Sequence, residues 1–193
     1  MNKPSSIKLN ISGYEVLPIP TGLFGLDGGA MFGTVPKILW EKTNPTDEQN
    51  RIQMEARGLL LKNAKDKRNI LIDTGNGSDF VLKYGEKLGT SFVKMYNVDQ
   101  SGPSLVKSLK ENGLSPNDIT DVILTHLHFD HAGGSTTVNV KNEIVPTFPN
   151  AVYYLQRKNL ETAQNPNRRE RASYFPANYE PSINFKFPFL ING

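Results

Sequence analysis

The chain contains no cysteine, and this absence excludes several kinds of site. Disulfide bonds, zinc sites built from thiolates and a cysteine nucleophile are all ruled out. No apolar run approaches the roughly 18 residues that a membrane-spanning helix needs. The first residues, MNKPSSIKLNIS, also lack the apolar stretch of a secretory signal peptide. We therefore expect a cytoplasmic protein with no membrane partner. Secretion with a signal removed before the numbering begins is the alternative.

The chain also has little excess charge, with a formal net charge of +3 over 193 residues. Residues 1–150 are balanced, and the basic excess falls in residues 151–193, densest in NPNRRERASYF. A local excess of this kind is more typical of a solvated surface segment than of a nucleic-acid site. We expect a small-molecule substrate and no nucleic acid. The length is enough for one core, so we expect a single domain over residues 1–193.

Strand and helix patterns alternate along the chain. Runs of apolar residues predict strands at 7–20, 59–62, 70–73, 121–125, 142–150 and 151–156. Helical patterns occupy 79–88, 101–113 and 156–164. This order predicts a layered α/β domain, with functional residues at the carboxyl ends of its strands.

Two segments carry more specific local expectations. In the helix at 101–113, Ser101 or Gly102 can act as the cap, Pro103 suits the first turn and Gly113 ends it. The glycines of LFGLDGGAMFGTVPK predict a loop. We expect its bulky side chains to tuck inward; they are Phe24, Met31 and Phe32.

Histidine is the other scarce residue, and all three copies lie in the stretch THLHFDHAGG. His126, His128 and Asp130 are spaced by two, so in an extended or gently curved loop they point to one side. His131 should diverge from that row. Neutral imidazole and carboxylate are ligands of divalent metals. His126 and His128 can serve one metal, and Asp130 and His131 a second metal about 3.5–4 Å away.

The alternative is that these are ordinary surface or core histidines. Three imidazoles close together repel one another once protonated, and we see no stability advantage in that. The pattern H-x-H-x-D-H after an apolar strand therefore favours a metal site.

This stretch resembles the signature of the metallo-beta-lactamase-fold hydrolases. ILIDTG upstream also resembles that family, and SLVKSLKENGL followed by SPNDITDVILTHLHFDH is similar to it in order and spacing. The resemblance covers residues 7–160. LDGGAMFGTVPKILW is similar to a segment of the lactonase-like branch, which includes acyl-homoserine lactonases and related phosphotriesterases.

The resemblance implies an αββα sandwich and a two-metal site. His126 and His128 would bind the first metal, Asp130 and His131 the second, and Asp130 would also be the catalytic carboxylate. Asp73 would accept a hydrogen bond from a ligating imidazole and so fix its tautomer. The two divalent ions would be Zn, with Mn, Fe or Co as alternatives. A hydroxide between them would attack a lactone, ester or related carbonyl.

For other residues near these motifs, a structural role is as consistent with the sequence as a functional one. Asp73 could be a turn residue that precedes Thr74 and Gly75. Asp27 in LDGG is a weaker candidate, and we expect it to be a turn residue and not part of the site. We expect four aromatic side chains to be core or pocket wall; these are Phe24, Phe32, Tyr153 and Tyr154.

The family's remaining ligands are missing from this chain. No His follows His131 and no Asp follows Asp130, whereas the family supplies further ligands from its carboxyl-terminal half. We therefore expect the amino-terminal half of the sandwich plus the start of the second half. A homodimer or the missing half would then complete the site. The alternatives are a catalytically incomplete fragment or non-catalytic binding module, and a phosphotriesterase, thioesterase or one-iron oxygenase of the same fold.

Overall fold

The computed structural model describes residues 9–182 and 189–191. Its main sheet has seven strands in the order β1-β2-β3-β4-β5-β8-β9. The first four strands are paired antiparallel, and β4, β5, β8 and β9 are paired parallel. The strands are β1 (Leu9–Ile11), β2 (Tyr14–Asp27), β3 (Arg51–Asn63), β4 (Arg68–Ile72), β5 (Asp121–Ile123), β8 (Val152–Gln156) and β9 (Phe189–Ile191). A separate hairpin pairs β6 (Thr136–Val138) with β7 (Ile144–Pro146).

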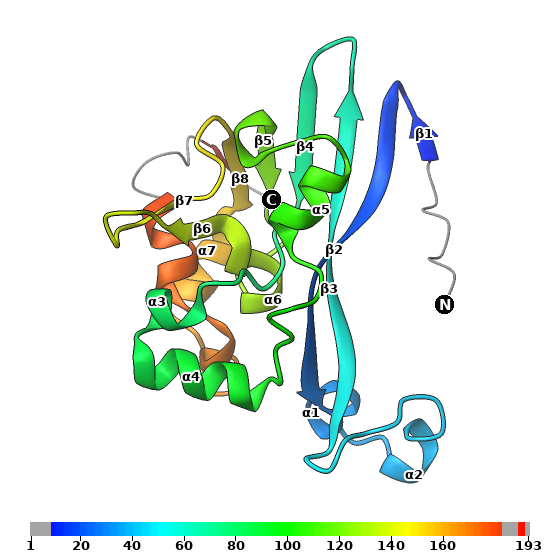
Figure 1. Ribbon diagram of the computed structural model, residues 1–193. Helices are drawn as coiled ribbons and strands as arrows, with labels where there is room; N and C mark the ends of the chain where they lie inside the picture. The colour runs from blue at the N-terminus through cyan, green and yellow to red at the C-terminus, as the bar shows by residue number, and fades with distance from the viewer. Residues whose placement is uncertain (1–8, 183–188, 192–193) are drawn as a thin grey trace.

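Short helices connect and cover these strands. They are α1 (Gly28–Phe32), α2 (Lys37–Trp40), α3 (Phe80–Tyr84), α4 (Glu86–Met95), α5 (Leu105–Glu111), α6 (Phe129–Ala132) and α7 (Arg157–Gln164). In Figure 1 the β2–β3 hairpin forms a long arm with α1 and α2 at one end, and α3, α4, α6 and α7 gather to one side of it. The predicted mixed α/β class is confirmed.

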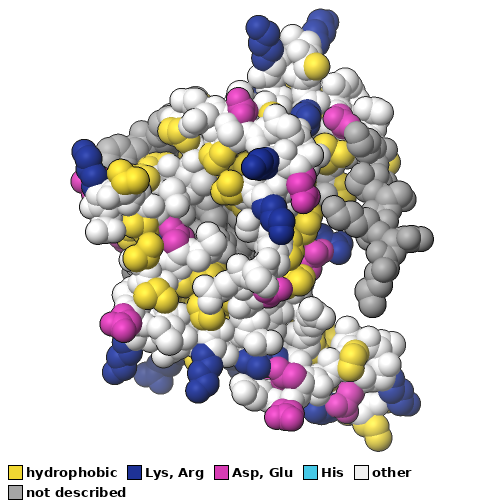
Figure 2. All heavy atoms as spheres, viewed as in Figure 1, with side chains coloured by type: hydrophobic (Ala, Val, Ile, Leu, Met, Phe, Trp, Pro, Cys, Tyr) yellow, Lys and Arg dark blue, Asp and Glu magenta, His cyan; other side chains and the backbone are white. Residues whose placement is uncertain are grey.

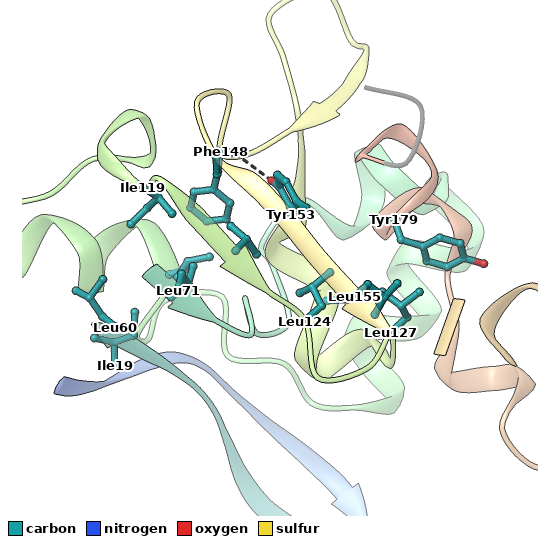
Figure 3. Close-up of a cluster of buried hydrophobic side chains, with 14 of the residues drawn as sticks. Ile19, Leu60, Leu71, Ile119, Leu124, Leu127, Phe148, Tyr153, Leu155 and Tyr179 are labelled. Carbon is teal, nitrogen blue, oxygen red and sulfur yellow. Dashed lines mark hydrogen bonds between the residues drawn. The ribbon is translucent and has the colours of Figure 1, made fainter. Parts of the chain in front are cut away.

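The core lies against one face of the main sheet. Leu71, Val122 and Tyr153, from three adjacent parallel strands, are almost fully buried and belong to one hydrophobic cluster. Figure 3 labels Leu71 and Tyr153 within this cluster. Two helices cover them, through Leu105 and Leu109 of α5 and Leu160 and Ala163 of α7. Each large apolar side chain buried in this way contributes about 1.5–3 kcal/mol. This packing fixes the carboxyl end of β5, from which the histidine loop emerges, beside that of β4.

The predicted loop at LFGLDGGAMFGTVPK was wrong. Strand β2 continues through Asp27, because β3 starts at Arg51 and offers a partner along its full length. Gly25 pairs with Gln53 inside the ladder, so it does not act as a breaker. A register shift between Pro20 and Gly22 absorbs the irregularity.

Of the side chains expected to tuck inward from this segment, Phe24 is buried and Met31 is exposed. Phe32 is intermediate and stacks on Trp40 with ring centroids 4.8 Å apart.

Helix boundaries also differ from the prediction. The pattern at 79–88 is two helices, α3 and α4, which meet at Gly85, where φ is +81°. Helix α5 is capped by Ser104, not by Ser101 or Gly102, because Ser101 and Gly102 instead donate to the side chain of Asp99.

The surface of the described residues shows scattered cations. Figure 2 shows Lys and Arg side chains at the tip of the β3–β4 hairpin and along the edge formed by α4. The basic side chains expected to be solvated are exposed; they are Arg157, Lys158, Arg168, Arg169 and Arg171. Lys186 lies outside the described residues. No helix within the described part of the chain is long and apolar enough to span a membrane.

Candidate metal centre

Two loops meet at the carboxyl edge of the parallel strands. Asp73 follows β4 and Thr125 follows β5, and these strands pair in parallel with Ile72 opposite Ile123. The Asp73 amide donates to the carbonyl of Ile123 at 2.9 Å. Parallel pairing therefore places the ILIDTG loop beside the histidine loop, at the edge where α/β proteins bind ligands.

The histidine stretch is bent rather than extended. His128 is the N-cap of α6, a single helical turn that contains Asp130 and His131. The rings of His126 and His131 have centroids 4.0 Å apart, closer than the 4.6 Å between His126 and His128. The expectation that His131 diverges was therefore wrong. The helical turn brings a residue three positions after His128 back towards the same side.

Asp73 is the buried centre of the hydrogen-bond network. Its Oδ1 accepts from the Thr125 amide at 2.8 Å, and its Oδ2 lies 2.8 Å from Nδ1 of His131. The backbone of Asp73 has φ +57°, a left-handed conformation that few non-glycine residues adopt. Strain of this kind persists where surrounding bonds over-determine the position, and it is common at functional sites.

Thr125 extends this network to a second histidine. Its hydroxyl donates to Asp73 Oδ2 at 2.8 Å and lies 3.1 Å from Nδ1 of His126. Because a hydroxyl has one hydrogen, His126 Nδ1–H must be the donor in the second contact. Both His126 and His131 are then held in the tautomer that leaves Nε2 with a free lone pair. The motif alone gave no reason to single out Thr125, although it is the first letter of the stretch.

His128 carries the feature that best fits a metal ligand. Its Nε2 atom is buried and has no hydrogen-bond partner among the residues that the structure describes. Its ring packs edge-on against Tyr174, with centroids 4.7 Å apart, and the two residues also form a β-bridge. A buried polar atom without a partner costs about 1–3 kcal/mol, so a missing ligand is a physical explanation for it.

The distance between the side chains of Asp130 and His131 also fits a cation that both bind. Oδ2 of Asp130 lies 3.4 Å from Nε2 of His131. In the tautomer that Asp73 imposes, this pairs a carboxylate with an imidazole lone pair. Two ligands about 2.1 Å from one tetrahedral metal lie roughly 3.4 Å apart. The donor set therefore fits a divalent metal.

The described residues do not close such a site. Among residues 9–182 and 189–191, no group of three or more His, Asp or Glu side chains could hold a metal ion. The roles of all four predicted ligands stay predictions, as does that of Asp73 behind them.

The environment separates the three histidine pKa values. Burial and the neighbouring imidazoles lower the pKa of His126, and burial lowers that of His128. Burial also acts to lower the pKa of His131, but the hydrogen bond to Asp73 and the charge of Asp130 outweigh it and raise the pKa. Neutral imidazoles at 126 and 128 are in the protonation state that metals bind.

A proton titration of the metal-free protein is our first prediction. By NMR, His131 should titrate above the ordinary value of 6.5, and His126 and His128 below it. The charged form of His131 then stabilises the fold at pH below 6.5, and this contribution is lost as pH rises through its raised pKa. Asp73→Asn should lower the pKa of His131, with Asp66→Asn on the β3–β4 turn as control. Three histidines titrating together would contradict this network.

The remaining candidates lie away from the histidines. Asp27 caps α1 by accepting from the Ala30 amide at 3.0 Å, and its pKa is lowered chiefly by the hydrogen bond from Asn50. Tyr153 is a core residue whose hydroxyl donates to the Ser135 carbonyl at 3.1 Å. Tyr154 donates to Asp121 at 3.2 Å.

A known family shares this fold and this stretch. The model of the Metallo-beta-lactamase superfamily matches residues 59–169, more than half of the chain. The chain therefore belongs to the metallo-beta-lactamase superfamily, and the resemblance read from the sequence is confirmed.

Individual relatives narrow the comparison. An N-acyl homoserine lactonase from Bacillus cereus is 32% identical over 124 residues, which are 61% of this chain and 41% of the relative. A "probable metal-dependent hydrolase" from Staphylococcus aureus has 30% identity and a TM-score of 0.75, covering 95% of this chain and 61% of that one. AidC, a dizinc quorum-quenching lactonase, shares the fold at 22% identity, with a TM-score of 0.58 over 95% of this chain and 55% of its own. The chain thus spans less than half the length of the lactonase from Bacillus cereus.

Proposed function

We propose that this chain carries the motif-bearing part of a metal-dependent hydrolase that opens a lactone of the N-acyl homoserine type. The observation that carries the proposal is the buried, unpartnered Nε2 of His128 within a cluster of all three histidines. The lactonase from Bacillus cereus supports the substrate class. Lactones, esters and related carbonyl compounds share the electrophilic centre that such a site attacks.

Each residue of the centre has a definite task in this proposal. His126 and His128 hold one divalent ion, zinc in the first instance, and Asp130 with His131 hold a second. Asp73 accepts a 2.8 Å hydrogen bond from Nδ1–H of His131, which leaves the Nε2 lone pair available to a metal. Divalent metals, when bound, make water nucleophilic near neutral pH and polarise the substrate carbonyl. Tyr174 covers His128 and limits the access of bulk water to it.

One observation favours a second candidate. No three ligands converge on one point within the described residues, so the chain alone could be a non-catalytic metal-binding module of the same fold. Two imidazoles bind a metal more weakly than the three protein ligands of a catalytic zinc site. The two candidates differ in turnover, not in metal binding.

The second prediction separates them. The zinc-loaded chain is assayed with N-hexanoyl homoserine lactone, a nitrophenyl ester, a phosphotriester and a thioester. We expect lactone opening that is lost on chelation and in the His126→Ala, His128→Ala double variant, with Asn165→Ala as a surface control. Metal binding without turnover of any substrate would instead support the binding module, and turnover of the phosphotriester or thioester alone would reassign the substrate class.

A further inference from the structure

Lys83 is a lysine buried inside the molecule. Its side chain, on α3, has no exposed area. Nζ donates to the Gly133 carbonyl at 2.5 Å and lies 3.3 Å from the carbonyl of Thr136. Burial lowers the pKa of Lys83 to about 8, partly offset by Asp79, so the ammonium is still largely charged at pH 7. Lysine is rarely buried without a specific partner, and here the partners are main-chain oxygens together with the carboxylate of Asp79.

Asp79, the N-cap of α3, lies one helical turn before Lys83 and contacts the chain a few residues beyond Gly133 and Thr136. Its Oδ1 lies 3.7 Å from Lys83 Nζ, and its Oδ2 accepts from the amide of Val138 at 2.7 Å. Together the two side chains contact both ends of residues 133–138. Only Ala132 separates this segment from His131.

Close packing restrains the start of that segment on its other side. Gly133 and Gly134 lie against the backbone of residues 74–76, at the end of the ILIDTG segment, and a Cβ added to either would overlap main-chain atoms there. The Gly134 amide donates to the carbonyl of Gly75 at 3.0 Å, and the Thr74 amide donates to that of His131 at 2.7 Å. The loop that carries Asp73 and the loop that carries His131 are therefore packed backbone on backbone.

Lys83 contacts the loop after His131 on the side that faces α3. The Gly133 carbonyl points to Nζ, so the loop after His131 lies between the ILIDTG loop and α3. Without the ammonium, the buried carbonyls of Gly133 and Thr136 would lose a charged donor, which is a costly loss. The loop would then gain freedom to move away from Asp73.

We propose that Lys83 is a positioning residue, which holds His131 in register with Asp73 and so shapes the candidate metal centre from the opposite side of the loop. The inference rests on the proposed function for its purpose, but not for its geometry. Lys83 does not touch the histidines, and it acts through the Gly133 carbonyl.

The test compares Lys83→Met with the wild-type chain in the absence of metal. Methionine keeps an unbranched stem of four heavy atoms, with sulfur in place of one methylene, and removes the charged donor. The readout is the Nδ1 proton of His131, followed by NMR together with hydrogen exchange of the Thr74 amide. We expect the His131 signal to shift or broaden and the Thr74 amide to exchange at least about tenfold faster. Lys87→Met on the exposed face of α4 is the charge control, with no change expected.

A second control separates positioning from general destabilisation. Trp40→Leu lowers stability at α2, at the end of the β2–β3 arm remote from α6 (Figure 1), and should leave the His131 signal unchanged. An unchanged His131 signal in a folded Lys83→Met protein would overturn the proposal. If Lys83→Met does not fold, Asp79→Asn removes the neighbouring charge but keeps an acceptor for Val138. A smaller shift of the same signal is then expected, and no shift would overturn the proposal.

Cobalt titration distinguishes this inference from the proposed function. We expect Lys83→Met to weaken Co²⁺ binding by roughly tenfold, as loss of an outer-shell partner does. If the wild-type chain binds no cobalt, the proposed function fails, while the metal-free NMR comparison still decides the role of Lys83.

Discussion

Replacement of His128 by leucine should move two measurements in opposite directions. Zinc affinity should fall by more than the 10–100-fold that loss of an outer-shell partner costs, because a direct ligand is removed. The metal-free protein should be as stable as wild type, or more stable by up to about 1–3 kcal/mol, because the buried unpartnered Nε2 disappears. Calorimetric zinc titration and urea unfolding of the metal-free protein measure the two effects.

This pair of outcomes separates a metal ligand from a structural histidine. A histidine kept for packing or hydrogen bonding would lose stability when replaced and leave zinc affinity unchanged. Lys158→Leu, an exposed change on α7, serves as the control for a simple gain of leucine. Reduced metal-free stability together with normal zinc affinity would refute the role given to His128.

Gly133→Ala should strongly destabilise the fold around the site. The added Cβ would overlap the carbonyl group of Asn76 and lie 2.9 Å from the oxygen of Gly75. These are main-chain atoms in a packed loop and cannot swing aside. We expect a loss of about 3 kcal/mol or more in unfolding free energy, at or beyond the upper end for overpacking.

Gly102→Ala is the matched control for that loss. Its new Cβ would meet only the side chain of Asp99, 2.6 Å from Oδ2, and this side chain would have to shift against the hydrogen bonds that Ser101 and the Gly102 amide donate to its Oδ1. We expect a loss of no more than about 1.5 kcal/mol, smaller than that for Gly133→Ala, because the obstacle is a side chain and not the main chain. If both variants unfold at the same urea concentration as wild type, the close packing of the two loops is wrong.

Short-range patterns predicted the elements whose signals are local. The apolar run before the histidines became β5, and the helical spacing at 156–164 became α7. The glycines of residues 23–37 misled the prediction, because strand formation there depends on pairing with β3, some thirty residues away. A breaker residue is tolerated in a strand when a long partner strand satisfies its backbone.

The candidate site also combines residues that sequence motifs predict with contacts that only the fold creates. His126, His128, Asp130 and His131 follow from one motif, and Asp73 from a second one. Their mutual approach required the parallel pairing of β4 with β5 and the helical turn of α6, which no spacing rule in an extended loop anticipates.

Two supporting residues had no recognisable sequence signal. Lys83 reads as an ordinary helix lysine, because its burial arises only where α3 packs against β6. Thr125 is the first residue of the histidine stretch, but its spacing gives it no role, because that role depends on Asp73 lying beside it at the sheet edge.

The most direct test of the central claim, that these histidines bind a divalent metal, is zinc K-edge X-ray absorption of the protein loaded with one equivalent of zinc. We predict imidazole nitrogen scatterers about 2.0–2.1 Å from the metal. These scatterers should disappear in the His126→Ala, His128→Ala double variant. A spectrum with oxygen neighbours only, identical in the wild-type chain and the double variant, would contradict the claim.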